Sequence, residues 1–292
     1  MAPAHYRTKL LVIIGPTASG KSALALKLAK ELNGEIISAD SWTVYKGFDV
    51  GTSKSTTTQQ KAVKHHLIDV REPSDGFNAP MFKEMAEIAI KDIQKQGKLP
   101  ILVGGTGLYI DSVIYNFGFL DNSTPGERQA LDDTDLPGLL ELTKSRKIDL
   151  TDVDIRNKRR VIRAIEAKGQ KPSRGRLRSG TLLIGLQPPP ELLKAKIEAR
   201  VDQMLAAGLE QEVKQLAGRY GWDTEPMKGI GYQQWREYFE GSQSLEETRQ
   251  RIISATNGLA KRQRTWFKRN SDIKWFTVAE QAYSYITQAL NN

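Results

Sequence analysis

Residues Gly15 to Ser22 have the types and the spacing that bind phosphate groups. Their sequence, GPTASGKS, matches the pattern G-x-x-x-x-G-K-[ST] between a predicted strand and a predicted helix. Glycines at this spacing let the backbone bend around phosphate oxygens, so that N–H groups and the helix N-terminus point at them. Lys21 adds a positive charge, and the Ser22 hydroxyl can bind Mg²⁺. Unless the match is a chance turn, the segment predicts a site for a di- or triphosphate.

Asp40 is the next candidate, at the end of the predicted strand Glu35–Ser38. In a parallel sheet, the carboxyl end of this strand faces the phosphate-binding loop, so Asp40 can reach the reactive end of the ligand. A carboxylate there can hold Mg²⁺ or act as a general base. The alternative is that Asp40 only caps the following turn.

A second glycine-rich turn, Gly-Gly-Thr-Gly at 104–107, follows the predicted strand Leu99–Val103. Many nucleoside triphosphatases have an acidic residue at the end of such a strand. The glycines instead permit close approach of a large ligand to the backbone. Asp69 could still be the acidic residue at the end of a strand that holds a metal. We expect structural roles for His65 and His66, which precede it.

The elements that must position these residues alternate between strands and helices over the first third of the chain. We expect a helix at Ser22–Leu32, another at Pro80–Gln96 and a loop at Ser53–Gln60. This alternation predicts an α/β fold with a parallel sheet flanked by helices, like that of phosphate-binding-loop nucleoside triphosphatases. The remaining strands are expected at Leu10–Ile14, Leu67–Val70 and Thr181–Leu186.

The pattern changes between residues 115 and 179, where the sequence is helical and polar without a clear strand. We therefore expect an α-helical insertion domain at 115–179 within a catalytic core formed by 1–114 and 180–292. From Glu191 onward the chain is predicted to be helical, with a break around Gly218–Gly231.

The composition of the 292 residues is that of a globular protein, with 39% hydrophobic residues. No apolar run reaches the roughly 18 residues that a membrane span needs, and no secretory signal is expected. The absence of cysteine excludes disulfides, thiolate zinc sites and cysteine nucleophiles, which is typical of the cytoplasm. We expect a monomer, because the sequence has no heptad pattern.

The net charge of +9 is concentrated in two blocks. Residues 144–178 contain 13 Lys or Arg and four Asp or Glu, and residues 249–269 contain seven Lys or Arg and no acid. Such blocks indicate a polyanionic partner, although solvated helix faces are the alternative. In the second block, the cations alternate with Trp266 and Phe267, which suits phosphate contacts and base stacking. Both aromatic residues could instead belong to the core.

In combination, these segments resemble the tRNA dimethylallyltransferase (tRNA isopentenyltransferase) family over nearly the whole chain. The phosphate-binding loop alone is common to many families, whereas two of the later segments are specific. The matching segments are GPTASGKS (15–22), SADS-x-x-VY (38–45), GT-x-K (51–54), HHLID (65–69), PILVGGTGLYI (100–110), RRVIRAIE (159–166), RVDQM (200–204), GIGY (229–232) and AKRQ-x-TWF (260–267).

This resemblance implies transfer of a dimethylallyl group from dimethylallyl diphosphate to the exocyclic amine of the adenosine 3′ to the anticodon, in tRNAs that read codons beginning with U. Asp40 would be the general base, with Thr106 beside the reacting centre and Lys21 and Mg²⁺ stabilising the departing diphosphate. The target adenosine would be flipped into a channel. The diphosphate would contact Gly15, Pro16, Thr17, Ala18, Ser19, Gly20, Lys21, Ser22 and Arg200.

The resemblance also implies a set of residues that contact the tRNA anticodon stem-loop, drawn from the core, the insertion and the C-terminal basic block. These are Asp40, Ser41, Trp42, Thr43, Thr106, Arg128, Arg159, Arg160, Val161, Ile162, Arg163, Lys261 and Arg262.

Several positions depart from the family pattern. Thr43 stands where the family has a Gln that would bond the target base, and Asn257 replaces an Arg. GT-x-K is followed by Ser55 where the family has Pro, and the HPND-like turn reads DIRN at 154–157. None of these positions is Lys21, Asp40 or Thr106. The lack of a zinc-finger segment after the last predicted helix is typical of the bacterial type.

Three other functions remain open from the residues alone. A small-molecule kinase would use the same loop with Asp40 as base, but has no need of two basic blocks. Prenylation of a free adenosine nucleotide would not need a basic C-terminal helix. A non-catalytic RNA-binding protein would not need the intact residues Gly20, Lys21, Ser22 and Asp40.

Overall fold

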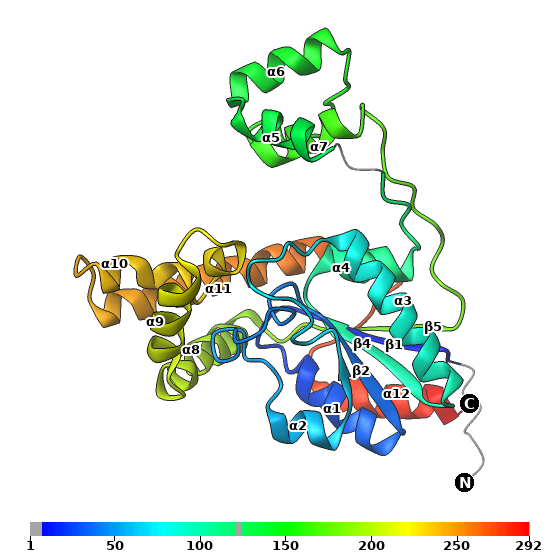
Figure 1. Ribbon diagram of the computed structural model, residues 1–292. Helices are drawn as coiled ribbons and strands as arrows, with labels where there is room; N and C mark the ends of the chain where they lie inside the picture. The colour runs from blue at the N-terminus through cyan, green and yellow to red at the C-terminus, as the bar shows by residue number, and fades with distance from the viewer. Residues whose placement is uncertain (1–7, 121–123, 292) are drawn as a thin grey trace. The chain divides into compact units, whose positions relative to one another are not determined.

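A six-stranded, wholly parallel sheet forms the centre of the larger of two units in this protein (Figure 1). The computed structural model describes residues 8–120 and 124–291. Their strand order is β3-β2-β4-β1-β5-β6, which confirms the predicted α/β fold. The apolar runs of the central strands are buried throughout, as expected where helices cover both faces. The strands are β1 (Leu10–Ile14), β2 (Gly34–Ala39), β3 (His65–His66), β4 (Leu99–Gly104), β5 (Thr181–Leu186) and β6 (Lys274–Phe276).

Helices cover both faces of the sheet (Figure 1). On one face, α1 (Lys21–Glu31) packs Leu24 and Leu28 into the same apolar cluster as Ile286 of α12 (Ala279–Asn291). The other face is covered by α3 (Ala79–Lys95) and α4 (Gly107–Ile114). Since β1 ends beside α1, this arrangement fixes the phosphate-binding loop at the carboxyl edge of the sheet.

The C-terminal half of the larger unit is helical and has an apolar core of its own. Trp235, Tyr232 and Phe48 are fully buried there, with the Phe48 and Tyr232 ring centroids 4.8 Å apart. No helix among the described residues has both the length and the apolar character needed to cross a bilayer. The elements are α8 (Pro190–Ala206), α9 (Leu209–Tyr220), the 3₁₀ turns η1 (Glu225–Lys228) and η2 (Gln233–Trp235), α10 (Arg236–Phe239) and α11 (Leu245–Phe267).

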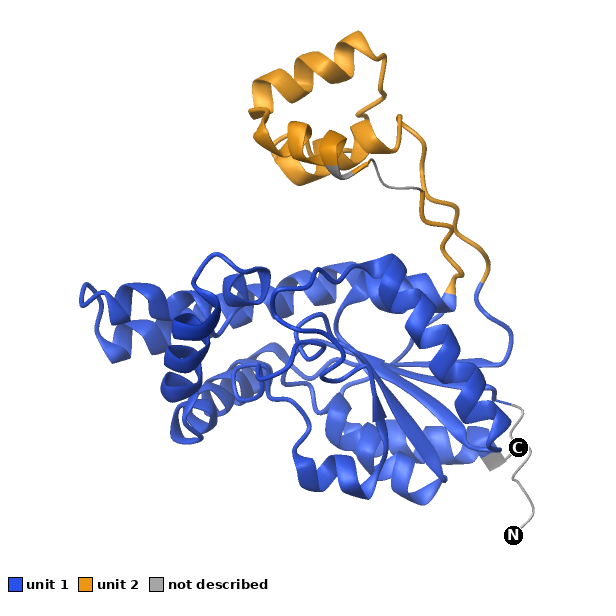
Figure 2. Ribbon diagram, in the orientation of Figure 1, with its two compact units in different colours: residues 1–114, 177–292 blue, residues 115–176 orange. Residues whose placement is uncertain are grey.

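The chain divides into unit 1, residues 1–114 and 177–292, and unit 2, residues 115–176 (Figure 2). Unit 2 contains α5 (Pro125–Asp133), α6 (Leu136–Ser145) and α7 (Lys158–Glu166). Its second boundary lies three residues before the expected one, because Arg178 pairs with Glu87 of α3 at 2.8 Å and so belongs to unit 1. Residues 1–7, 121–123 and 292, which the expected domains include, lie outside the described residues.

Four local expectations are corrected by the structure. The expected loop at 53–60 contains the start of α2 (Thr57–Ala62), which a capping box between Thr56 and Gln59 begins. The strand expected at 67–70 is wrong: β3 precedes it, and positive φ values at Leu67 (61°) and Asp69 (55°) interrupt an extended chain. Strand β6 was not expected. The helical C-terminal half also breaks at Gly208, where φ is +92°.

Candidate active site

The phosphate-binding loop joins β1 to α1 and leaves the first turn of α1 uncapped. Gly20 precedes the helix with φ of +92°, and no side chain of the described residues caps this turn. A Cβ on Gly15 would lie 2.6 Å from the Leu186 carbonyl oxygen, so this position requires glycine. The Ser19 hydroxyl is buried without a hydrogen-bond partner among the described residues. The loop therefore has N–H and O–H groups available for phosphate oxygens.

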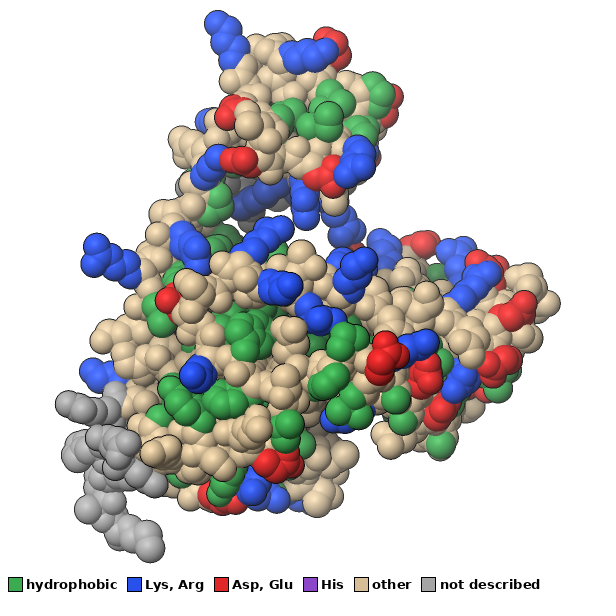
Figure 3. Space-filling model, turned by 180° about the vertical axis from the view of Figure 1, so that it is seen from behind, with side chains coloured by type: hydrophobic (Ala, Val, Ile, Leu, Met, Phe, Trp, Pro, Cys, Tyr) green, Lys and Arg blue, Asp and Glu red, His purple; other side chains and the backbone are tan. Residues whose placement is uncertain are grey.

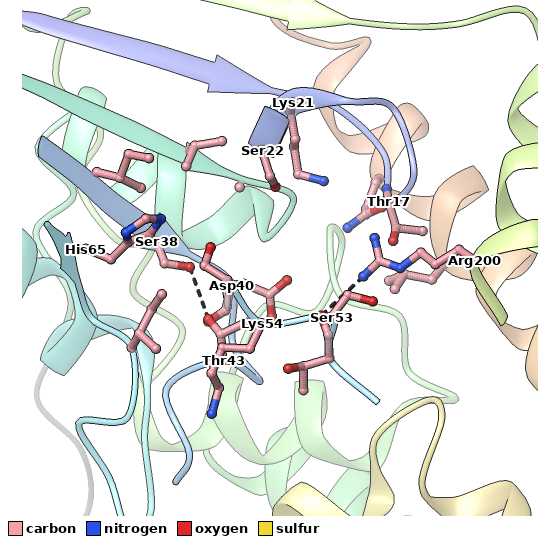
Figure 4. A pocket seen from close by; sticks show the side chains of 18 residues that line it. Thr17, Lys21, Ser22, Ser38, Asp40, Thr43, Ser53, Lys54, His65 and Arg200 are labelled. Atoms are coloured by element: carbon pink, nitrogen blue, oxygen red, sulfur yellow. Dashed lines mark hydrogen bonds between the residues drawn. The ribbon is translucent and has the colours of Figure 1, made fainter. Parts of the chain in front are cut away.

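A cavity of about 100 Å³ opens beside this loop and brings together the main residues expected in the site. Figure 4 shows Lys21 and Arg200 extending toward it from α1 and α8, with Asp40 between the phosphate-binding loop and Thr43. Thr17, Ser22, Gly104 and Gln263 also contribute to its wall. The apolar side chains of Ile36, Ile68 and Val103 line it as well. The cavity wall thus contains both cationic and apolar side chains.

Two cations determine the electrostatics of the cavity. Burial of the Lys21 ammonium group, with nearby Arg200, lowers its pKa to about 8, although Asp40 acts in the opposite direction. Burial also lowers the pKa of Arg200, whose guanidinium donates to the Thr52 carbonyl oxygen at 3.2 Å. Lys21 Nζ donates to the Pro16 carbonyl oxygen at 3.2 Å. Two partly desolvated cations on one cavity favour an anionic ligand.

Asp40 both caps a turn and lines the cavity, so its capping contact does not exclude the predicted role toward a ligand. Its Oδ1 accepts the Trp42 N–H at 2.9 Å, while Oδ2 has no hydrogen-bond partner in the described part of the chain. The neighbouring Ser41 N–H donates to Thr106 Oγ1 at 3.2 Å. Thr106 therefore lies beside Asp40 without lining the cavity itself.

Thr43 is buried and lies in the cavity wall. Its hydroxyl lies 3.0 Å from Ser38 Oγ and donates weakly to the Asp40 carbonyl oxygen at 3.4 Å. Thr43, which stands where the family has a Gln, thus lines the cavity with a shorter side chain, and its hydroxyl bonds other residues of the protein.

The glycines of the second turn make room for α11. A Cβ on Gly105 would lie 2.3 Å from Gln263 Nε2, and one on Gly107 would lie 2.3 Å from Trp266 Cδ1. The sequence analysis expected a large ligand to approach this turn, but side chains of the protein's own helix do so. Gly104 is also constrained, because a Cβ there would lie 2.1 Å from the Ala39 carbonyl oxygen of β2.

His65, His66 and Asp69 make contacts within the protein, and His65 also lines the cavity. His66 Nε2 lies 2.7 Å from the buried carboxylate of Glu35. His65 Nδ1 bonds the Val63 carbonyl oxygen at 2.7 Å, burial lowers its pKa, and its ring lines the cavity. Asp69 accepts from Lys54 at 2.5 Å, which excludes it as a free acidic strand end for a metal.

The loop at 49–54 is held by Lys54 and Glu212, two residues without a predicted role. Lys54 is buried, and its ammonium group donates to the Tyr45 carbonyl oxygen, Asp49 and Asp69. The carboxylate of Glu212 in α9 accepts three consecutive backbone N–H groups and the Tyr232 hydroxyl, which makes four hydrogen bonds. The N–H donors are Asp49 (3.1 Å), Val50 (2.7 Å) and Gly51 (3.0 Å). Lys54 belongs to the GT-x-K segment and could have been singled out. Glu212 stands in no motif.

Unit 2 uses several of the residues that were expected to contact tRNA for its own structure. Val161 and Ile162 have no exposed surface and pack in the apolar core, which corrects their predicted contact with tRNA. Arg128 of α5 pairs with the buried carboxylate of Glu166 at 3.2 Å and so joins α5 to α7, and Arg163 pairs with the same carboxylate within α7 at 3.3 Å.

The exposed cations of the expected set lie in both units. Arg159 and Arg160 are exposed at the start of α7 in unit 2. Lys261 and Arg262 on α11 are exposed and have no acidic partner among the described residues. On the face drawn in Figure 3, Lys and Arg predominate over the upper part of unit 1, and Asp and Glu mix with them toward the end that carries α10.

The aromatic residues of the C-terminal segment have different environments. Phe267 is buried, whereas 39% of Trp266 is exposed and its Nε1–H donates to Asp111 Oδ2 at 2.8 Å. Phe267 therefore belongs to the core, and Trp266 remains accessible to a ligand.

A parallel sheet with a phosphate-binding loop after β1 and a carboxylate facing it across a cavity defines an α/β enzyme that acts on a phosphorylated substrate. The model of the family described as IPP transferase matches residues 43–270. The chain belongs to the IPP transferase family.

Known proteins resemble the chain over almost its whole length. It is 41% identical to a tRNA dimethylallyltransferase of Anoxybacillus flavithermus, over 93% of this chain and 91% of that protein. The crystal structure of a full-length tRNA isopentenylpyrophosphate transferase from Bacillus halodurans matches with 36% identity and a TM-score of 0.75, covering 97% of each chain. A eukaryotic dimethylallyltransferase acting on tRNA matches with 27% identity and a TM-score of 0.82, over 96% of this chain and 79% of that one.

Proposed function

We propose that this protein is a tRNA dimethylallyltransferase that transfers a dimethylallyl group from dimethylallyl diphosphate to N6 of the adenosine 3′ to the anticodon. The tRNAs would be those that read codons beginning with U. The observation that carries this proposal is that the carboxylate of Asp40 and the cations Lys21 and Arg200 line one cavity, together with apolar side chains.

In this reaction the phosphate-binding loop holds the diphosphate of the prenyl donor. N–H groups at the start of α1, where no side chain of the described residues caps the helix, bind its oxygens. Lys21 and Arg200 stabilise the negative charge that grows as the C–O bond breaks. The apolar side chains of Ile36, Ile68 and Val103 give the five-carbon group a surface that excludes water.

The acceptor is an adenine that has left the base stack of the tRNA loop. As the bond between N6 and C1 of the dimethylallyl group forms, the amine loses a proton, and Asp40 Oδ2 accepts it. Thr106, bonded to the Ser41 N–H, holds the turn that follows Asp40. Thr43 and Trp42 complete the expected surface for the base.

A divalent metal, Mg²⁺, would be held by Ser22 Oγ and by oxygens of the diphosphate. The donor set fits this ion, since Ser22 lines the cavity and Mg²⁺ usually binds one or two protein oxygens, phosphates and water. No cluster of three or more His, Cys, Asp or Glu offers a protein-only cage in the described chain. When bound, the ion neutralises diphosphate charge.

The tRNA would contact exposed cations of both units, among them Arg159, Arg160, Lys261 and Arg262. Such contacts with the phosphate backbone supply affinity without sequence specificity. We further propose that the protein acts as a monomer and in the bacterial cytoplasm, where its tRNA substrate occurs.

Incubation with radiolabelled dimethylallyl diphosphate, Mg²⁺ and unmodified tRNA tests the proposal. We expect label in the RNA, at the adenosine 3′ to the anticodon. Consumption of ATP without labelling of RNA would instead indicate a kinase, and RNA binding without either reaction would indicate a non-catalytic protein. Labelling of free adenosine nucleotide but not of tRNA would indicate the nucleotide prenyltransferase.

A further inference from the structure

Gln263 of α11 connects the basic C-terminal helix to the phosphate-binding loop. Its Oε1 accepts the backbone N–H of Thr17 at 2.8 Å, across 246 residues of sequence. Its side chain lines the cavity together with Lys21, Ser22 and Arg200. Gln263 belongs to the AKRQ-x-TWF segment, in which the sequence analysis gave roles only to its neighbours.

The hydrogen bond from Thr17 fixes which way the Gln263 amide faces. A backbone N–H can only donate, so the oxygen of the amide lies toward Thr17 and the nitrogen lies on the other side. In agreement, a Cβ on Gly105 would lie 2.3 Å from Nε2. Within the described residues this Nε2 group has no hydrogen-bond partner. Two N–H donors therefore lie beside Gly105, in a fixed direction, on a side chain that lines the cavity.

We propose that Gln263 is a diphosphate-binding residue, which donates a hydrogen bond from Nε2 to an oxygen of the donor's diphosphate while Oε1 holds the Thr17 N–H. The identity of the donor rests on the proposed function. The negative charge of the diphosphate grows as it leaves, so this hydrogen bond is strongest when the C–O bond breaks. The role also explains the glycine at position 105, since a side chain there would displace the amide.

Binding of inorganic pyrophosphate with Mg²⁺, measured by calorimetry on the full-length protein, tests this role. Gln263→Glu keeps an oxygen for the Thr17 N–H but replaces the Nε2 donors with a negative oxygen. Gln263→Met keeps the length and removes both functions. We expect each variant to bind pyrophosphate about tenfold or more weakly, with the larger loss for Gln263→Glu. Gln250→Met is the control, because Gln250 lies on the same helix and its side chain bonds Glu246 and no other described residue. The affinity of this variant should equal that of the wild type.

A purely structural role predicts a different order of affinities. If Gln263 only holds the loop, Gln263→Glu keeps the Thr17 contact and loses only the affinity that its added negative charge costs. Gln263→Met would then be the weaker binder, and this order would overturn the proposal. Unchanged affinity in Gln263→Met would overturn it as well, and thermal unfolding of each variant identifies any that fails to fold. The assay uses neither tRNA nor a prenyl group. Failure of the wild type to label tRNA would therefore count against the proposed function and not against this role.

Discussion

Asp40 shows how one carboxylate serves two purposes through its two oxygens. Oδ1 accepts the Trp42 N–H at 2.9 Å, which fixes the side chain, and Oδ2 is left for a ligand in the cavity. A base held in this way does not lose rotamer freedom when the substrate binds. Substitutions at Asp40 can therefore separate the positioning of the turn from the acceptance of the proton.

We predict that Asp40→Asn abolishes transfer and leaves tRNA affinity unchanged. The Asn oxygen still accepts the Trp42 N–H, but the amide cannot accept the proton, so the rate should fall by about 10²- to 10⁴-fold. Single-turnover transfer and filter binding of tRNA measure the two effects. Asp92→Asn, an exposed carboxylate on α3, is the control. A normal rate in Asp40→Asn would show that another group is the base.

Lys21 gives the donor site a dependence on pH. Its pKa of about 8 in the free protein means that the side chain is mostly charged at neutral pH and neutral at higher pH. A diphosphate stabilises the charged form. The part of the pyrophosphate affinity that depends on the charge of Lys21 is therefore present below about pH 8 and is lost as the pH rises above this value.

We predict that the pyrophosphate affinity of the wild type falls by up to about tenfold per pH unit above 8. In Lys21→Met the affinity is lower at neutral pH, and this part of the pH dependence disappears. Calorimetry over the range from about pH 7 to 9.5 compares the two proteins. An equally steep profile in Lys21→Met would assign the titration to another group.

At the scale of elements, Glu212 fastens the loop at 49–54 to α9. One carboxylate accepts three backbone N–H groups and the hydroxyl of the buried Tyr232. Burial raises the pKa of Tyr232, and the negative charge of Glu212 raises it further. The loop then presents the Thr52 carbonyl oxygen to Arg200. The position of Arg200, the cation expected to bind the diphosphate, thus depends on a residue outside the cavity.

We predict that Glu212→Ala lowers the free energy of unfolding by about 2 to 4 kcal/mol, because it leaves four donors without their acceptor. Glu210→Ala on the same helix is the matched control. Glu210 accepts a single hydrogen bond, from Tyr238, and its loss should cost about 1 kcal/mol or less. Urea denaturation measures both. Equal destabilisation by the two substitutions would refute the role of Glu212.

The exposed cations of α11 permit a second prediction at this scale. Lys261→Ala with Arg262→Ala removes two expected phosphate contacts, so tRNA binding should weaken. The slope of log affinity against log salt should fall by about 1.5. Lys30→Ala with Lys61→Ala removes the same charge from exposed positions on α1 and α2 and should leave the slope unchanged. Identical slopes in the two double variants would exclude α11 from the tRNA contact.

Patterns within one segment predicted most of the elements, but not those that depend on distant partners. Apolar runs located β1, β4 and β5, because buried parallel strands have few polar positions. Strand β6, at Lys274–Phe276, has only three residues and is defined by its pairing with β5. Helix α2 has no buried residue, so no apolar period marked it, although its Thr56 to Gln59 capping box is visible in the sequence.

In the candidate site, too, residues in local motifs could be predicted, whereas residues that depend on distant contacts could not. Lys21 and Asp40 could be predicted because their motifs report a local geometry, a loop before a helix and the end of a strand. Gln263 and Glu212 contact the site across 246 and more than 160 residues of sequence. Such contacts follow from packing in three dimensions. In unit 2, a motif shared with the family marked Val161 and Ile162, which belong to the apolar core.

At the scale of the whole molecule, each unit has apolar clusters that share no residue with those of the other. Leu139, Val161 and Ile162 form the centre of unit 2, while the clusters on the sheet and around Trp235 belong to unit 1. The chain leaves and re-enters unit 1 at one place, where the Arg178 N–H donates to the Ile114 carbonyl oxygen at 2.8 Å. Unit 1 therefore does not need unit 2 to complete its core.

We predict that replacing residues 115–176 with a short Gly-Ser linker leaves unit 1 folded and able to bind pyrophosphate within about threefold of the wild-type affinity, because every side chain of the cavity lies in unit 1. Affinity for tRNA should fall by about tenfold or more, since the exposed cations of unit 2, including Arg160, are lost. Calorimetry and filter binding on the same preparation separate the two effects. Undiminished tRNA affinity in the shortened protein would mean that unit 2 does not hold the RNA, and loss of pyrophosphate binding together with cooperative unfolding would mean that the two units share a core after all.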